Sequence, residues 1–183
     1  IDTNASYNLI GGELAAFANT ISGNGESGIR LVNTTSRYNR ILGNRIGTDF
    51  AGTSALPNGL HGIHSFASEH TIIGSDAPEG GNIIAGNMGD GVRLEYNTGY
   101  TLLYNNRIGM DGGGQALGNG GNGITMVLKG YSSVVGNGEA GSANTIAFNA
   151  GHGIWITGSG LNKIRGNQIH DNALKGIALD SGA

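Results

Sequence analysis

Basic side chains recur at one place in a repeated sequence motif. The motif is Asn-x-x-x-Gly-[Ile/Val], and in three successive copies its aliphatic residue is followed by Arg30, His64 or Arg93. A carboxylate, Glu95, comes two residues after Arg93. Guanidinium and imidazole groups bind carboxylates and hydroxyls, and enzymes that cleave polysaccharides use carboxylates. If the chain is an enzyme, Arg30, His64, Arg93 and Glu95 form the only catalytic centre that the sequence offers.

Aromatic residues extend this candidate surface. Phe66 lies two residues after His64, and Trp155 follows the aliphatic position of a later motif copy. Aromatic rings present a broad apolar face on which sugar rings stack. A mixed, solvated strand face without a ligand is the simpler interpretation of the same side chains, and we keep both. The predicted ligand-binding set is Arg30, His64, Phe66, Arg93, Glu95 and Trp155.

A second aromatic column has a spacing of 31 residues or a multiple of it. Its members are Tyr7, Tyr38, Tyr100 and Tyr131, with Glu69 at the intermediate position. If positions 31 apart lie above one another, the pairs Tyr7/Tyr38 and Tyr100/Tyr131 stack, which contributes about 0.5–1.5 kcal/mol per pair. The column is interpreted either as stabilising stacking or as an aromatic platform for a glycan.

Acidic residues do not form an obvious catalytic pair. On the strand face that follows the motif, the acids are Glu95 and Asp180, three repeats or about 14 Å apart. Asp49 and Asp111 occupy matching places in "GTDFAG" and "GMDGGG", where a weak Ca²⁺ site or a turn-stabilising role are the alternatives. The pair His61-x-x-His64 has no evident third ligand. No other metal or cofactor is expected.

Internal repeats determine how these side chains are positioned. Aliphatic residues recur every 31 or 30 residues, at Ile10, Ile41, Ile72, Leu103, Val134 and Ile164. The motif itself occurs six times, at Asn24/Gly28, Asn58/Gly62, Asn87/Gly91, Asn119/Gly123, Asn149/Gly153 and Asn172/Gly176. Insertions alternate between two places, so the larger unit is about 62 residues, or two repeats.

Short runs of alternating apolar and polar residues predict strands with one buried face. Such strands become stable when each pairs with the same strand of the next repeat, in parallel ladders about 4.8 Å apart. The 36 Gly residues are suited to the many corners that such a coiled chain needs. Asn at a repeated corner can form a ladder of side-chain amides. The prediction is an all-β solenoid of about six coils, with positions 31 apart stacked and the aliphatic residues inside.

The repeats also resemble a known family. "NTISGNGESGIRL", "NRIGTDFAGTSALPNGLHGI" and "NTIAFNAGHGIWI" are similar to the repeats of right-handed parallel β-helix proteins, most closely those of large bacterial secreted and surface proteins. The wider superfamily contains pectate lyases, polygalacturonases, alginate epimerases and phage tailspikes. The resemblance covers essentially the whole chain and implies the right-handed fold and an extracellular or cell-surface location. In carbohydrate-active relatives, an exposed strand face of this kind commonly carries the substrate groove.

Charge and hydropathy limit the classes of partner that the chain can be expected to bind. The net charge is −3, only 13% of residues are charged, and no basic stripe is present, which argues against nucleic acid. No apolar run approaches the roughly 20 residues of a membrane-spanning helix. Residues 1–183 are predicted to form a single β-helix domain, either a piece of a longer chain or a subunit that stacks end to end.

Three functions remain open. The favoured one is a structural or adhesive extracellular segment, binding a polysaccharide or cell-surface glycan along one strand face. The second is a lyase, hydrolase or epimerase that acts on acidic glycans. The third is a self-assembling filament subunit.

Overall fold

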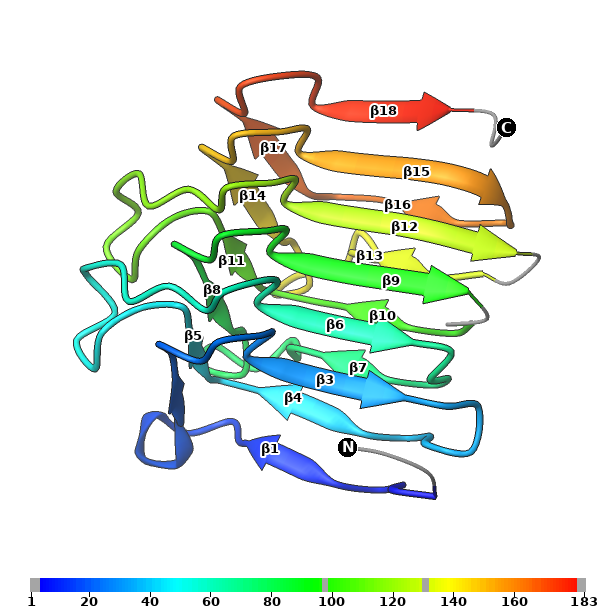
Figure 1. The fold of residues 1–183 in the computed structure, drawn as a ribbon, viewed down its shortest axis with the longest axis horizontal. Helices are drawn as coiled ribbons and strands as arrows, with labels where there is room; N and C mark the ends of the chain where they lie inside the picture. The colour runs from blue at the N-terminus through cyan, green and yellow to red at the C-terminus, as the bar shows by residue number, and fades with distance from the viewer. Residues whose placement is uncertain (1–3, 97–98, 130–131, 181–183) are drawn as a thin grey trace.

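The chain winds into a three-sided solenoid of six coils (Figure 1). A computed structural model describes residues 4–96, 99–129 and 132–180. Each coil contributes one short strand to each of three sheets, here called A, B and C, and every strand pair is parallel. The all-β fold with six stacked coils is therefore confirmed. A single 3₁₀ turn, η1 (Ala15–Phe17), lies in the first coil, and no described segment forms a helix able to cross a membrane.

The strands of the three sheets follow one another in chain order, and each sheet has six. Sheet A consists of β1 (Leu9–Gly11), β4 (Arg40–Leu42), β7 (Ile72–Ile73), β10 (Leu102–Leu103), β13 (Val134–Val135) and β16 (Lys163–Ile164). Sheet B consists of β2 (Thr20–Ile21), β5 (Arg45–Ile46), β8 (Ile83–Ile84), β11 (Arg107–Ile108), β14 (Thr145–Ala147) and β17 (Gln168–His170). Sheet C has the longest strands: β3 (Ile29–Val32), β6 (Ile63–Phe66), β9 (Val92–Tyr96), β12 (Ile124–Lys129), β15 (Ile154–Ser159) and β18 (Ile177–Asp180).

Aliphatic side chains from all three sheets fill the interior. Period-two alternation places one residue of each short strand inside, and equivalent residues of neighbouring coils pair directly. Ile84, Ile108 and Ile146 of sheet B are completely buried, as are Leu94 and Met126 of sheet C. One continuous apolar core results.

The predicted spacing is wrong by one residue in two coils of sheet A. Ile41 pairs with Ile73 rather than Ile72, and Leu103 pairs with Val135 rather than Val134. Each of these coils has two adjacent β-branched residues, so alternation alone does not tell which of the two faces the interior. The local reason is the corner: in the coils with an insertion after sheet A, the left-handed residue follows the buried aliphatic directly, as Gly74 follows Ile73 (φ +79°).

Buried asparagines join the coils along the corners. Between sheets B and C, each Asn side chain donates from Nδ2 to Oδ1 of the Asn in the next coil, at 2.8–2.9 Å. The same Nδ2 donates to a main-chain carbonyl of the preceding coil, such as Ile84 O for Asn119. A second ladder runs between sheets A and B. The two ladders are Asn24–Asn58–Asn87–Asn119–Asn149–Asn172 and Asn19–Asn44–Asn82–Asn106–Asn144–Asn167.

Glycine is required where coils approach each other at a corner. Gly109, which ends the repeated Asn-Arg-Ile-Gly sequence, has φ +89°. A Cβ at this position would lie 2.0 Å from the carbonyl oxygen of Ala147 in the next coil. Both the backbone conformation and the contact exclude a side chain here, which explains why Gly recurs in the motif.

The insertions form two sets of loops on opposite sides of sheet B. Coils one, three and five carry them between sheets A and B, at residues 11–18, 75–81 and 137–143. Coils two and four carry them between sheets B and C, at 48–57 and 110–118. These two loops project outward, one above the other, on the side of sheet B (Figure 1). The alternation therefore places long loops on both flanks of one sheet.

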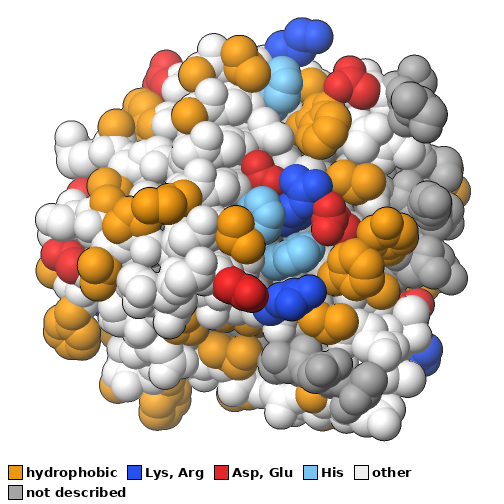
Figure 2. All heavy atoms as spheres, viewed as in Figure 1, with side chains coloured by type: hydrophobic (Ala, Val, Ile, Leu, Met, Phe, Trp, Pro, Cys, Tyr) orange, Lys and Arg blue, Asp and Glu red, His pale blue; other side chains and the backbone are white. Residues whose placement is uncertain are grey.

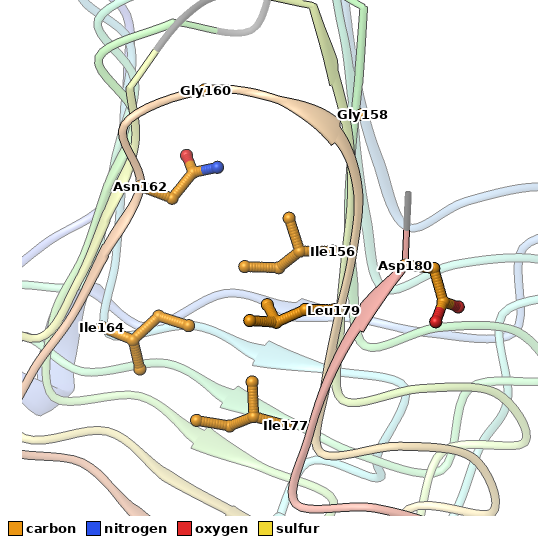
Figure 3. Close-up of a pocket in the computed structure, with 8 residues that line it drawn as sticks. All are labelled: Ile156, Gly158, Gly160, Asn162, Ile164, Ile177, Leu179 and Asp180. Atoms are coloured by element: carbon orange, nitrogen blue, oxygen red, sulfur yellow. The ribbon is translucent and has the colours of Figure 1, made fainter. Parts of the chain in front are cut away.

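The core is open at the last coil. Ile156, Ile164, Ile177 and Leu179 point into the space enclosed by the final coil, whereas Asp180 points away from it (Figure 3). Leu179 is 73% exposed, although its equivalents Leu94 and Met126 are completely buried. The last coil thus presents an apolar surface.

The Asn ladder predicts a strong position dependence of stability. Asn119→Ala leaves the buried main-chain N–H of Asn87 without its acceptor and removes the ladder hydrogen bonds to Asn87 and Asn149, so we expect a loss of about 3 kcal/mol in the free energy of unfolding. Asn24→Ala, at the exposed start of the ladder, is the control and is expected to lose less than about 1 kcal/mol. Urea unfolding measures both, and equal losses would contradict a cooperative buried ladder.

Candidate functional site

The candidate site lies on the outer face of sheet C. In this sheet Arg30, His64 and Arg93 pair in register on β3, β6 and β9, and the next column contains Val32, Phe66 and Glu95. Figure 2 shows basic, acidic and histidine side chains gathered at the centre of this face, bordered by hydrophobic side chains. The face thus combines charged and aromatic groups at one place.

One guanidinium group holds two carboxylates together. Arg93 donates to Oε1 of Glu95 from Nε at 2.8 Å and from Nη2 at 2.6 Å, and its Nη1 donates to Oδ2 of Asp90 at 3.0 Å. On the other side of Glu95, Oε2 lies 2.9 Å from Nε2 of His64. These side chains are between 8% and 26% exposed, so they are well packed but still reachable from solvent.

Asp90 and His61 are fixed by a ladder at the corner before sheet C. Nδ1 of His61 accepts the main-chain N–H of Asp90 at 3.0 Å, and Oδ1 of Asp90 accepts the N–H of Asn122 at 2.8 Å. The same pattern continues from Asn122 to His152 and from His152 to Lys175. These hydrogen bonds give His61 and Asp90 a structural role, and they leave Oδ2 of Asp90 directed at Arg93.

Protonation in the cluster is set by burial and by these hydrogen bonds. Burial lowers the pKa of His61, and the nearby carboxylate of Asp90 only partly opposes this effect. The neutral form agrees with the acceptor role of Nδ1. Burial alone would raise the pKa of Glu95, but hydrogen bonds from Arg93 and His64 outweigh it and hold that pKa below its usual value. Glu95 therefore stays ionised at neutral pH.

Aromatic rings adjoin the charged cluster on β6 and β9. The ring of Phe66 lies 4.7 Å from that of Tyr96 and 6.3 Å, edge to face, from that of His64. Tyr96 is 49% exposed, directly after Glu95. An apolar ring surface thus lies beside hydrogen-bonding groups.

Comparison with family models identifies the architecture. Residues 18–183 match the model described as "Right handed beta helix region". The chain belongs to the right-handed β-helix family. Comparisons of this β-helix with curated proteins and with solved structures gave no match. The family relationship and the three parallel sheets agree, and the family supplies the handedness; neither assigns a ligand or a reaction.

The β-helix brings together most, but not all, of the predicted site residues. His64, Arg93 and Glu95 are in direct contact, Phe66 adjoins His64, and Arg30 pairs with His64 in the sheet. Trp155 is two coils beyond Arg93, about 9.6 Å away along the axis, and its Nε1 donates to Asp180 at 2.6 Å. Trp155 therefore lies outside the cluster.

One strand residue expected to face solvent is covered. Alternation places Thr125 outward on β12, but it is completely buried between Arg93 and Trp155, its partners in register, and its hydroxyl accepts from Asn122 Nδ2 at 2.9 Å. Ala178 is likewise only 3% exposed. The larger neighbours on this face cover the small residues, which alternation does not predict.

The sequence reasoning missed Asp90, His61 and Tyr96 as members of the cluster. Asp90 and His61 precede the Gly of the motif, at a corner rather than on a strand; Asp90 was not considered, and His61 was considered only with His64 as a possible metal-binding pair. Their signal is positional, because both come directly before Gly-[Ile/Val] in adjacent repeats. Tyr96 extends the strand one residue past Glu95, at a left-handed φ of +59°.

The tyrosine column is present in the structure, but one of its predicted members is replaced by the neighbouring residue. Tyr7 and Tyr38 stack with ring centroids 5.0 Å apart, but the next member is His70, not Glu69, at 4.8 Å from Tyr38 and 4.7 Å from Tyr100. All four residues have φ between +54° and +61° at the corner before sheet A. The displacement by one residue is the same one that replaces Ile72 with Ile73. Tyr131 lies outside the described residues.

Asp49 and Asp111 close turns within their own loops. The N–H groups of Thr53 and Ser54 bind Asp49 and lower its pKa, while Asp111 accepts from Gly113 and Gln115. In the part of the chain that the structure describes, no group of three or more His, Asp or Glu side chains is arranged to hold a metal ion. The hydrogen bonds of these two residues fit the turn-stabilising role.

The neutral state of His61 predicts an acid-sensitive fold. Because its pKa is lower in the folded than in the unfolded protein, the stability it contributes is complete above pH about 6.5 and is lost as pH falls toward the folded value. His61→Asn keeps an acceptor for the N–H of Asp90 but does not titrate. We expect a shallower decrease of Tm between pH 7 and pH 5 in this variant.

The control for this experiment is His170→Asn, which removes an exposed histidine outside the cluster. Glu95 contributes in the same direction at lower pH, since its pKa is lowered and its contribution is lost below its usual pKa. A Tm profile of His61→Asn parallel to that of the wild type would contradict the assignment of His61.

Proposed function

We propose that the protein binds a polysaccharide along the outer face of sheet C, as a structural or adhesive segment. The observation that carries the proposal is the cluster of Arg93, Glu95, Asp90 and His64 beside the rings of Phe66 and Tyr96. Donors and acceptors held in fixed geometry suit sugar hydroxyls, and an adjacent ring suits the apolar face of a sugar.

The charge balance favours a neutral glycan on this face. Arg30 and Arg93 carry two positive charges, Asp90 and Glu95 carry two negative charges, and burial keeps His61 neutral. Two carboxylates would repel the acid groups of an anionic polymer. Arg30, His64 and Arg93 alone would form a cationic column suited to an acidic glycan, but with the two carboxylates present we propose a neutral glycan for this face.

The ionised, hydrogen-bonded state of the carboxylates favours binding of a glycan over its cleavage. A hydrolase needs one carboxylic acid that is protonated when it meets the substrate, whereas Arg93 and His64 stabilise the ionised form of Glu95. A lyase needs a cation for the carboxylate of the substrate, and Arg93 already binds two carboxylates. The cluster thus supports recognition better than acid-base chemistry, and the extracellular or cell-surface location remains part of the proposal.

The face also suits an extended ligand. Six coils place six equivalent outward positions along about 24 Å of sheet C. A polymer lying parallel to the axis would contact several coils, with the cluster near the middle at β6 and β9. This length corresponds to several sugar units rather than one.

The test is binding of neutral and acidic hexasaccharides, measured by calorimetry. We expect at least one of cellohexaose, xylohexaose and mannohexaose to bind, and Phe66→Ala and Glu95→Gln each to weaken this binding at least tenfold. Tyr7→Ala, which removes a stacked ring on another face, is the matched control and is expected to bind as the wild type does.

The same mixtures distinguish binding from catalysis. Absence of binding to all three neutral sugars, or binding unaffected by Phe66→Ala, would overturn the proposal. Release of new reducing ends or of unsaturated products during incubation would replace it with the enzymatic alternative.

End-to-end self-association is a second candidate function, and the polarity of the Asn ladders favours it. Each ladder Asn donates toward the following coil, so the last coil presents amide donors and the first presents amide oxygens. Leu179, which is 73% exposed, and the partly buried Ile10 and Ile21 add apolar contacts at the two end faces. A second copy stacked head to tail would continue both ladders.

Light scattering at increasing protein concentration tests this association. We expect the mean mass of the wild type to rise with concentration and Leu179→Lys to remain a monomer, because a charge on the end face opposes stacking. Leu56→Lys, on an exposed insertion, is the control. A wild type that stays monomeric at all concentrations would exclude this candidate.

A further inference from the structure

A second candidate binding site lies on sheet B, on a different face from the cluster described above. A cavity of about 330 Å³ opens over the outer side of β5, β8 and β11. Its floor is formed by Arg45, Ile83 and Arg107, which are adjacent in register on these three strands. This volume lies in the range of small-molecule sites.

The insertions form walls on both sides of this floor. On one side, the N–H of Ala15 donates to Oε2 of Glu79 at 2.6 Å, which joins the loops 11–18 and 75–81. On the other side, the N–H of Gly112 donates to the carbonyl of Gly52 at 3.1 Å, which joins the loops 48–57 and 110–118. The loops 11–18 and 75–81 line the cavity itself, whereas the loops 48–57 and 110–118 lie beside Arg45 and Ile83 at the other edge of the floor.

The two arginines occupy equivalent positions. Each comes from an Asn-Arg-Ile-Gly sequence, at residues 44–47 and 106–109, so they lie two coils or about 9.6 Å apart along the axis. The loop wall orients both groups: Arg45 lies 5.9 Å from the centre of the Phe50 ring, and Nη1 of Arg107 donates to the carbonyl of Gly112.

Both guanidinium groups have hydrogen-bonding capacity to offer. Among the residues that the structure describes, Arg37, Arg40 and Arg93 form ion pairs with carboxylates, whereas Arg45 and Arg107 do not. Nε of Arg45 is fully buried without a hydrogen-bond partner. A buried donor in this state is costly and rare in folded proteins, and the burial of Nε leaves the terminal Nη groups of Arg45 as the donors that a ligand in the cavity would meet.

We propose that this cavity binds an acidic oligosaccharide whose carboxylate or sulfate groups contact Arg45 and Arg107. Guanidinium groups bind such oxyanions with paired, charge-assisted hydrogen bonds. Between the arginines, Ile83 and the nearby Pro78 offer apolar surface for a sugar ring, and Glu79 and Asn105 offer polar atoms for hydroxyls. The site is independent of the neutral-glycan face on sheet C.

The experiment is calorimetric titration of the protein with a hexagalacturonate and with a heparin-derived hexasaccharide, at low ionic strength. Preference for the first identifies carboxylate as the bound group and preference for the second identifies sulfate. We expect Arg45→Gln and Arg107→Gln each to weaken binding at least tenfold and the double variant to abolish it. Arg165→Gln, which removes an equal charge outside the cavity, is expected to stay within twofold of the wild type.

Two further variants separate a specific site from general attraction. Arg45→Lys keeps the charge but removes the planar, paired donors of the guanidinium group, and we expect it to weaken binding at least fivefold. Phe66→Ala is expected to leave this binding unchanged, so failure of the sheet C proposal would not affect it. Because Arg107 is exposed, Arg107→Gln remains informative if variants of Arg45 fail to fold.

The proposal is overturned if neither acidic hexasaccharide binds. It is also overturned if Arg165→Gln weakens binding as much as Arg107→Gln, because binding would then depend on net charge alone. The proposal also fails if inorganic sulfate, at the same concentration as the hexasaccharide, displaces it from the cavity. A single small anion would then bind as well as the oligosaccharide, and the spacing of the two arginines would contribute nothing to binding.

Discussion

The hydrogen bond from one buried asparagine amide to the next is the interaction on which the rest of the structure depends. Parallel strands of two or three residues cannot fix their own register, but an Asn in each coil that binds both neighbouring coils admits only one. Once the corners are fixed, the aliphatic residues beside them must meet in the interior. The outward residues must then align as well, and this brings Arg93 beside His64.

The same constraint explains which parts of the fold could be predicted. Asn-x-x-x-Gly-[Ile/Val] recurs in every coil, so it located sheet C and its register without error. The ladder between sheets A and B lies directly before the strands of sheet B, on the far side of the insertions, so the position of sheet A depends on where the chain leaves its strands. A two-residue run such as Ile72–Ile73 can present either side chain inward. The insertion that follows the strand determines which of the two side chains faces the interior. Alternation of apolar and polar residues does not predict the effect of that insertion.

The candidate site was predictable to the extent that it lies on strands. Arg30, His64, Arg93 and Glu95 share a face because period-two alternation and the ladder register place them there. Asp90 and His61 belong to a corner, where direction depends on main-chain geometry rather than on alternation. They changed the interpretation, because a carboxylate on each side of Arg93 converts a cationic column into a balanced cluster.

The two faces differ in where carboxylates stand relative to arginine. On sheet C, the strand spacing of two places Glu95 beside Arg93, and the corner adds Asp90, so the guanidinium is saturated by its own protein. On sheet B the strands are only two or three residues long, and no acid can follow Arg45 or Arg107 on the same face. Their charges must be balanced by loops, solvent or a ligand. Short strands flanked by long insertions therefore favour anion binding, whereas longer strands let the protein neutralise itself.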